Sequence, residues 1–134
     1  MIGDLLASFV VGAIVEPFTD RATRRATRAR IARLQRGGIL LGAVHAVHGD
    51  LPRFGDMWLS SEWQVSPGRV HLGSTTVVVE SVDDAARPGT SGDFMMPPGM
   101  DAVVLTLRGP GPLVEIAMAA ESEAWFRAAV APRP

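Results

Sequence analysis

The first apolar stretch of the chain is the eleven-residue run Leu5–Val15. With its flanks it extends to Met1–Phe18, which as a helix reaches roughly 27 Å, the low end of what crosses a bilayer. Small or polar residues recur along it at every fourth position and form one stripe on a helix: Asp4, Ser8, Gly12 and Glu16. The pattern predicts a helix that spans a membrane, or one that lies on a membrane or on the protein's own body with this stripe facing water.

The large side chains of this run are the expected membrane contacts: Leu5, Leu6, Phe9, Val10 and Ile14. Ser8 and Gly12 form a small-xxx-small pair, which allows two helices to approach closely. The run is therefore also a candidate homo-oligomer contact, and an oligomerisation helix if the protein is soluble. A secretory signal peptide fits poorly, because the first four residues carry no positive side chain and no cleavage motif ends the run.

Arginine dominates the next segment, Thr19–Arg36, which contains seven arginines. Thr19 or Asp20 can cap a helix, and Gly37-Gly38 can end it. Four of the arginines fall in an arc of about 100° on a helical projection: Arg21, Arg24, Arg25 and Arg28. The opposite side offers only Thr23, Thr27, Ile31 and Leu34, too thin an apolar stripe to anchor a buried helix.

Arginines directly after an apolar segment are typical of a cytoplasmic juxtamembrane flank under the positive-inside rule. Near anionic lipid each contributes about 1 kcal/mol, so we expect the four clustered arginines to contact anionic lipids of the cytoplasmic membrane. The predicted location is the cell membrane, with the N-terminus outside and the body cytoplasmic. A solvated charged helix in a cytoplasmic protein and a nucleic-acid-binding arm remain alternatives.

From Ile39 the pattern becomes strand-like, with short β-branched runs separated by turn signals. The runs are Ile39–His48, Phe54–Trp63, Arg69–Leu72, Thr75–Val82, Ala102–Arg108 and Leu113–Ala119. Ala120–Ala131 then has helix formers and ends at Pro132. We predict an α+β, mainly β, fold: a small antiparallel β barrel or sandwich closed by the C-terminal helix, with one or two N-terminal helices. Strands followed by one helix resemble the pleckstrin-homology-like superfold.

These patterns divide the chain into three parts. Residues 1–18 are the apolar N-terminal helix and candidate membrane anchor, residues 19–38 the arginine-rich juxtamembrane helix, and residues 39–134 the β-rich body with its C-terminal helix at 120–131. Within that last helix, Trp125 is expected to point inward with Ala128 or Ala129, because small alanines let a helix approach a sheet closely. Phe126 is expected to be the less buried of the two aromatic residues.

Three sequence stretches carry a closer resemblance: Trp58-Leu59-Ser60-Ser61, Val70–Leu72 and Glu115-Ile116-Ala117-Met118. Together with the apolar N-terminal segment and the arginine-rich link ending in Gly37-Gly38, they make the chain resemble the actinobacterial domain-of-unknown-function family 2550. The resemblance implies a single-pass membrane protein with a small pleckstrin-homology-like domain on the cytoplasmic side. It brings no catalytic residues with it. This chain departs from the pattern in its shorter apolar run.

Charge is divided unevenly along the chain, although the net charge is only −1. Residues 1–36 carry seven arginines and three acids, whereas residues 37–134 carry six arginines and eleven acids. The acidic body has no basic run, which disfavours nucleic acid as its partner. The absence of cysteine excludes a disulfide scaffold and metal sites built on thiolates.

The strongest candidate for metal chemistry is the pattern His45-x-x-His48-x-Asp50, with His71 as a further histidine. The residue types suit zinc or iron. On a strand, however, His45 and His48 point to opposite faces because their separation is odd. Structural histidines are therefore favoured over a metal site, and no cofactor is expected. A metal-dependent enzyme using His45, His48 and Asp50 remains the alternative from another functional class.

The long segment Asp83–Asp101 has no periodic pattern and contains an apolar cluster: Phe94, Met95 and Met96. Such a cluster either packs back onto the core as a plug or forms a partner surface. No catalytic serine motif and no phosphate-binding glycine loop occur in the chain. The leading interpretation is a non-enzymatic, membrane-associated interaction module with an unknown protein partner. A soluble oligomeric β-domain protein is the alternative.

Overall fold

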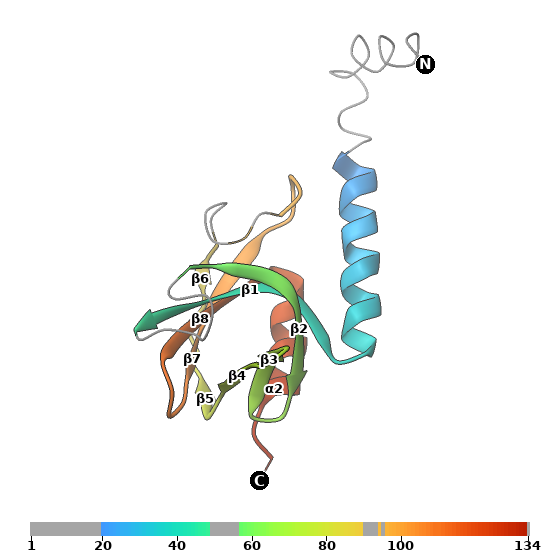
Figure 1. Cartoon of the computed structure of the whole chain (residues 1–134). Helices are drawn as coiled ribbons and strands as arrows, with labels where there is room; N and C mark the ends of the chain where they lie inside the picture. The colour runs from blue at the N-terminus through green and yellow to red at the C-terminus, as the bar shows by residue number, and fades with distance from the viewer. Residues whose placement is uncertain (1–19, 49–56, 90–93, 95, 134) are drawn as a thin grey trace, which may run out of the picture.

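The arginine-rich segment forms a helix, and the other described residues form one sheet with a second helix (Figure 1). The computed structural model describes residues 20–48, 57–89, 94 and 96–133. The helix over residues 20–36, here called the arginine helix, ends at Gly37 and Gly38, whose N–H groups donate to the carbonyls of Leu34 and Gln35. Gly38 has φ of 76°, a left-handed conformation that glycine adopts readily and that turns the chain into the first strand.

The strands of the described part of the chain are β1 (Ile39–His48), β2 (Leu59–Ser66), β3 (Arg69–Leu72), β4 (Thr75–Val78), β5 (Ser81–Val82), β6 (Arg87–Pro88), β7 (Ala102–Arg108) and β8 (Leu113–Ala119). They form one antiparallel sheet in the order β4-β3-β2-β1-β8-β7-β5, and β6 also pairs with β7. The first long strand thus lies beside the last one. The sheet is a half-barrel, and its order is compatible with a pleckstrin-homology-like arrangement.

The link between β4 and β5 joins the two ends of the sheet. The N–H of Val79 donates to the carbonyl of Gly68, in the turn between β2 and β3. The next N–H, that of Glu80, donates to the carbonyl of Arg108 at the end of β7. Because these acceptors lie toward opposite edges of the sheet, the two bonds hold the half-barrel in its curved shape.

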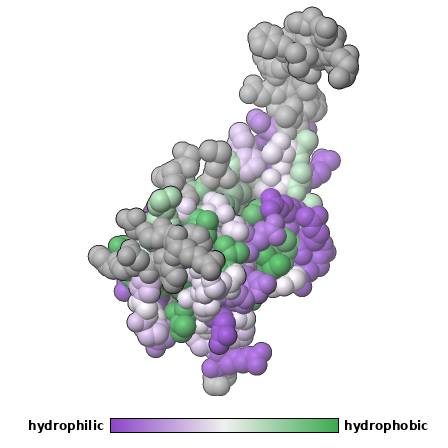
Figure 2. Space-filling view, viewed as in Figure 1, coloured by the Kyte–Doolittle hydropathy of each residue, from purple (hydrophilic) through white to green (hydrophobic). Residues whose placement is uncertain are grey.

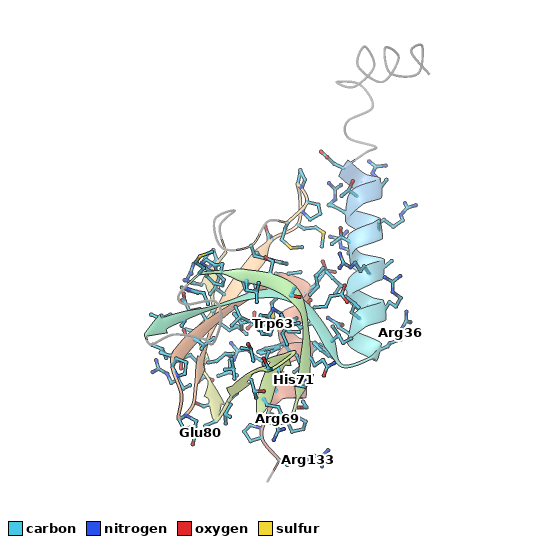
Figure 3. All side chains as sticks on the ribbon, in the orientation of Figure 1. Arg36, Trp63, Arg69, His71, Glu80 and Arg133 are labelled. Atoms are coloured by element: carbon cyan, nitrogen blue, oxygen red, sulfur yellow. The ribbon has the colours of Figure 1, made fainter. Side chains whose placement is uncertain are left out.

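The C-terminal segment fills the open side of the half-barrel. A 3₁₀ turn, η1 (Ala120–Ser122), leads into α2 (Glu123–Val130). Phe126 and Val130 of α2 are completely buried in the main core, together with Trp63 of β2 and residues of the other long strands. Trp63 is labelled in Figure 3, inside the curve of the sheet. The predicted fold class, an antiparallel sheet closed by a C-terminal helix, is confirmed.

The prediction for the two aromatic residues of α2 is wrong. Phe126 is 0% exposed, whereas Trp125 is only partly buried and packs at the margin of the core. Phe126 and Val130 are four residues apart and share one face of the helix, so together they present a larger apolar surface than Trp125 with Ala129. That face therefore turns inward.

Candidate functional site

The outer face of the sheet, opposite the main core, is covered by two further apolar clusters. In one, Phe94 packs on Ala43, Val104 and Ala117 of β1, β7 and β8. Register pairs Ala117 with both Ala43 and Val104, so these side chains share one face of the sheet. The small alanines leave room for the Phe94 ring. Phe94 is therefore buried against the sheet, as expected if the apolar cluster of this segment packs back onto the core, and it is not exposed to a partner.

The rest of that segment borders a cavity of about 500 Å³. Met96 is partly buried and lines the cavity with Phe94, Met100 and Arg87. Met95, the third residue of the predicted partner surface, lies outside the described residues.

The second outer cluster attaches the arginine helix to the body. Ile31 is 5% exposed and packs against Met100 and Ala119. The apolar side of the helix was expected to be too thin to pack, and Ile31 is indeed its single buried side chain among the described residues. The helix is nevertheless docked, because polar contacts on either side of Ile31 supplement its burial.

Polar contacts among the described residues connect the arginine helix to the body, and those of Arg24, Arg28, Arg30 and Gln35 join residues far apart in the sequence. They are Arg24 Nη1 to the Pro98 carbonyl (2.8 Å), Arg28 Nε to Glu121 Oε1 (3.2 Å), Arg30 Nη2 to Glu62 Oε2 (2.6 Å) and Gln35 Nε2 to Ser122 Oγ (3.3 Å). The partners belong to three regions: the segment before β7, the η1 turn and β2. The helix is thus held along most of its length.

The structure divides the four arginines that were expected to share one lipid-facing arc. Arg24 and Arg28 both contact the body, and Arg28 keeps 51% of its side chain exposed; Arg21 and Arg25 are exposed as well. Arg33 and Arg36, nearer the end of the helix, are exposed as well. At 100° per residue, the mean direction of Arg25, Arg33 and Arg36 lies about 130° from that of Arg24, Ile31 and Gln35. Arg25, Arg33 and Arg36 therefore face away from the body.

The figures show how the arginine helix lies relative to the sheet. The arginine helix runs alongside the sheet, and its N-terminal end extends away from the strands (Figure 1). Its surface is largely hydrophilic in the space-filling view (Figure 2). Arg36 points away from the sheet (Figure 3). The strongest local feature of the described chain is thus a basic helix docked on an acidic body.

The histidine pattern leads to a different polar cluster on the outer face of the sheet. His45 lies opposite Glu115 in the β1–β8 pair, and its Nε2 is 2.8 Å from Glu115 Oε1. The Arg87 guanidinium donates to both oxygens of the same carboxylate, through Nε at 3.2 Å and Nη2 at 3.3 Å. The ring of Trp58 stacks on His45 at a centroid distance of 3.9 Å.

The charge of Glu115 is stabilised by these neighbours. Burial raises the pKa of the Glu115 carboxyl, but hydrogen bonding with Arg87 and His45 and the positive charge of Arg87 lower this pKa by more. The net result is a pKa below the usual value of 4.5. His45 on β1, Glu115 on β8 and Arg87 on β6 thus form one polar cluster that connects these three strands.

Among the described residues, no group of three or more His, Asp or Glu side chains is arranged to hold a metal ion. His48 lies at the end of β1, beyond a register shift that follows Ala46, and its backbone pairs with Leu113. Asp50 lies outside the described residues. His71, labelled in Figure 3, is on β3, two strands away from β1.

Sequence reasoning missed Glu115 and Arg87. Glu115 is the single charged residue in the otherwise apolar strand Leu113–Ala119. A charge in such a strand is a sequence signal that could have identified Glu115. A partly buried charge on a central strand requires a partner. The partners of Glu115 are His45 on β1 and Arg87 on β6, which are distant in the sequence, so the local pattern does not identify them.

Searches against protein-family models, curated proteins and solved structures found no match to this chain. The resemblance to the domain-of-unknown-function family therefore stays a prediction. Within the described residues, no helix has both the length and the apolar character needed to cross a membrane. The predicted membrane contacts Leu5, Leu6, Phe9, Val10 and Ile14 lie outside the described residues.

Proposed function

We propose that the protein is a non-enzymatic interaction module held at the inner face of the cytoplasmic membrane. The observation that carries the proposal is the arginine helix, which docks on the body with one face and presents Arg25, Arg33 and Arg36 on another. In the sequence this helix directly follows the apolar run Leu5–Val15. An apolar run followed by a fixed basic surface combines the two signals that together give stable membrane association.

The polar side chains of the sheet support a binding role over a catalytic one. His45 and Arg87 hydrogen-bond to Glu115. Arg108 forms a bidentate ion pair with Asp83 at the edge of the sheet. These groups stabilise the fold by joining neighbouring strands. A module of this kind acts by bringing a protein partner to the membrane rather than by converting a substrate.

Flotation with lipid vesicles tests the proposal. The purified full-length chain is mixed with phosphatidylcholine vesicles that contain about 30% phosphatidylserine, and with vesicles of phosphatidylcholine alone. We expect the chain to float with the anionic vesicles and to bind them more strongly at low salt. A chain that stays at the bottom of the gradient with both vesicles, as a discrete oligomer, would instead identify a soluble oligomeric β-domain protein.

A further inference from the structure

We infer that the outer face of the arginine helix lies flat against the phosphate groups of an anionic bilayer. This outer face consists of three arginines and the four alanines on the same side of the helix: Ala22, Arg25, Ala26, Ala29, Ala32, Arg33 and Arg36. The inference rests on the proposed membrane association and goes further, because it names the side chains that touch lipid and fixes how the body is oriented.

The outer face has the geometry for a flat contact. Arg25 and Arg36 are eleven residues apart, so the arginines span about 16 Å along the helix axis. All three arginines have exposed side chains. The intervening alanines are short, which lets the helix backbone approach a plane while the guanidinium groups reach its phosphates.

The contacts on the opposite side fix the rotation of the helix about its axis. Ile31 is buried against the body, Arg28 binds Glu121, and Arg30 binds Glu62. A helix held at these three places cannot turn its outer face inward without losing them. The body consequently stays on the side of the helix that faces away from the proposed membrane contact.

Charge favours a bilayer over a nucleic acid as the partner. Residues 37–134 carry six arginines and eleven acidic side chains, a net charge of −5. A flexible or curved polyanion that followed the helix would meet this acidic body. A planar bilayer touches only the outer face, where Arg25, Arg33 and Arg36 are the ionisable side chains.

The absence of cysteine allows one specific label to be placed on the full-length chain. Ala29→Cys lies at the centre of the outer face, and Ser74→Cys in the turn between β3 and β4 is the matched control; both positions are exposed. Each protein carries a nitroxide, and collisions with a water-soluble nickel chelate are measured on anionic and on neutral vesicles. We expect the label at residue 29 to be shielded severalfold on anionic vesicles, and the label at residue 74 to remain accessible.

The arginines are then tested with two triple variants of equal charge. R25Q/R33Q/R36Q should abolish the shielding at residue 29 and lower the partition constant onto anionic vesicles about 100-fold, since each arginine contributes a factor of about five. R69Q/R108Q/R133Q, which removes three exposed arginines of the body and leaves the helix contacts intact, should keep both shielding and partition close to the parent values. Circular dichroism of the outer variant confirms that it is folded, as its substituted side chains are exposed.

Three outcomes would overturn the inference. If the chain floats with anionic vesicles but residue 29 stays accessible, the flat contact is wrong while membrane association stands. If the chain does not float with any vesicle, both proposals fail. If a short DNA duplex shields residue 29 at lower concentration than vesicles do, and the outer variant loses that shielding, the outer face is a nucleic-acid surface.

Discussion

Two adjacent aromatic side chains of α2 contribute unequally to the stability of the domain. Phe126 is completely buried in the main core, and Trp125 packs at its margin. Phe126→Ala should therefore lower the free energy of unfolding by roughly 3–5 kcal/mol, and Trp125→Ala by roughly 1–2 kcal/mol. Urea unfolding of the full-length variants measures both values. Equal losses, or a larger loss for Trp125→Ala, would mean that α2 closes the half-barrel with its other face.

Glu115 makes the stability of the protein depend on pH in the acid range. Because its pKa is lower in the folded chain than the usual 4.5, its ionised form contributes stability at higher pH. That contribution is lost as the pH falls below 4.5 through the folded-state pKa. In Glu115→Gln, the free energy of unfolding should depend less on pH below 4.5 than in the parent protein. Urea unfolding at several pH values measures this dependence.

Arg87→Gln is the matched variant for this test. It keeps the carboxylate but removes the guanidinium that donates to both its oxygens, so the dependence on pH should weaken in the same direction. If the free energy of unfolding falls with decreasing pH as steeply in both variants as in the parent protein, the Glu115 cluster does not contribute to the pH dependence of stability.

At the scale of the elements, the docking of the arginine helix depends mainly on one side chain. Ile31 is buried, whereas the ion pairs of Arg28 and Arg30 have side chains about half exposed. Ile31→Ala should cost about 2 kcal/mol, and Arg28→Gln or Arg30→Gln less than about 1 kcal/mol each. Hydrogen exchange should show lost protection at the body contacts Met100 and Ala119 in Ile31→Ala alone. Unchanged exchange in that variant would contradict the docking.

The turn between β7 and β8 supplies a second test with its own control. A Cβ on Gly109 would overlap the carbonyl oxygen of Val78, whereas a Cβ on Gly111 meets nothing within 4 Å. Gly109→Ala should lower the free energy of unfolding by roughly 1–3 kcal/mol, because the link from β4 to β5 would have to move. Gly111→Ala should leave it nearly unchanged. Thermal unfolding of both variants gives the comparison, and equal effects would argue against this close approach.

The pattern of apolar residues predicts a strand correctly where a turn sequence next to the strand marks its end. Ala102–Arg108 and Leu113–Ala119 are strands with the predicted bounds, since the Gly-Pro-Gly-Pro turn separates two regular apolar runs. Thr75–Val82 was expected to be one strand, but it divides into β4 and β5. The division arises because Val79 and Glu80 donate to carbonyls of distant segments, which no local pattern reveals.

The same limit applies to the candidate site. The sequence predicts an arginine-rich helix, and such a helix is present, but the side that meets the body could not be predicted. Ile31 is a single apolar residue, and its partners Met100 and Ala119 become neighbours only when the sheet has formed. The division of the arginines into body-facing and outward-facing sets is therefore a property of the tertiary structure.

At the scale of the whole molecule, the structure combines a basic helix with an acidic, mainly β body. The helix is fixed to the outer face of the sheet, while α2 fills the inner face. Both faces of the sheet are thus covered, and the charge asymmetry of the sequence becomes a spatial asymmetry. This arrangement leaves the outer face of the arginine helix as the basic surface that a membrane would meet.

Fractionation of cells that produce the full-length chain tests membrane association most directly. The proposed function predicts that the protein sediments with the membrane fraction and that R25Q/R33Q/R36Q weakens this association. Retention after carbonate or high-salt washing would identify an anchor that spans the bilayer, whereas release by salt would identify a surface association held by charge. Recovery of the intact, unmodified protein in the soluble fraction at low salt and without detergent would contradict the proposal.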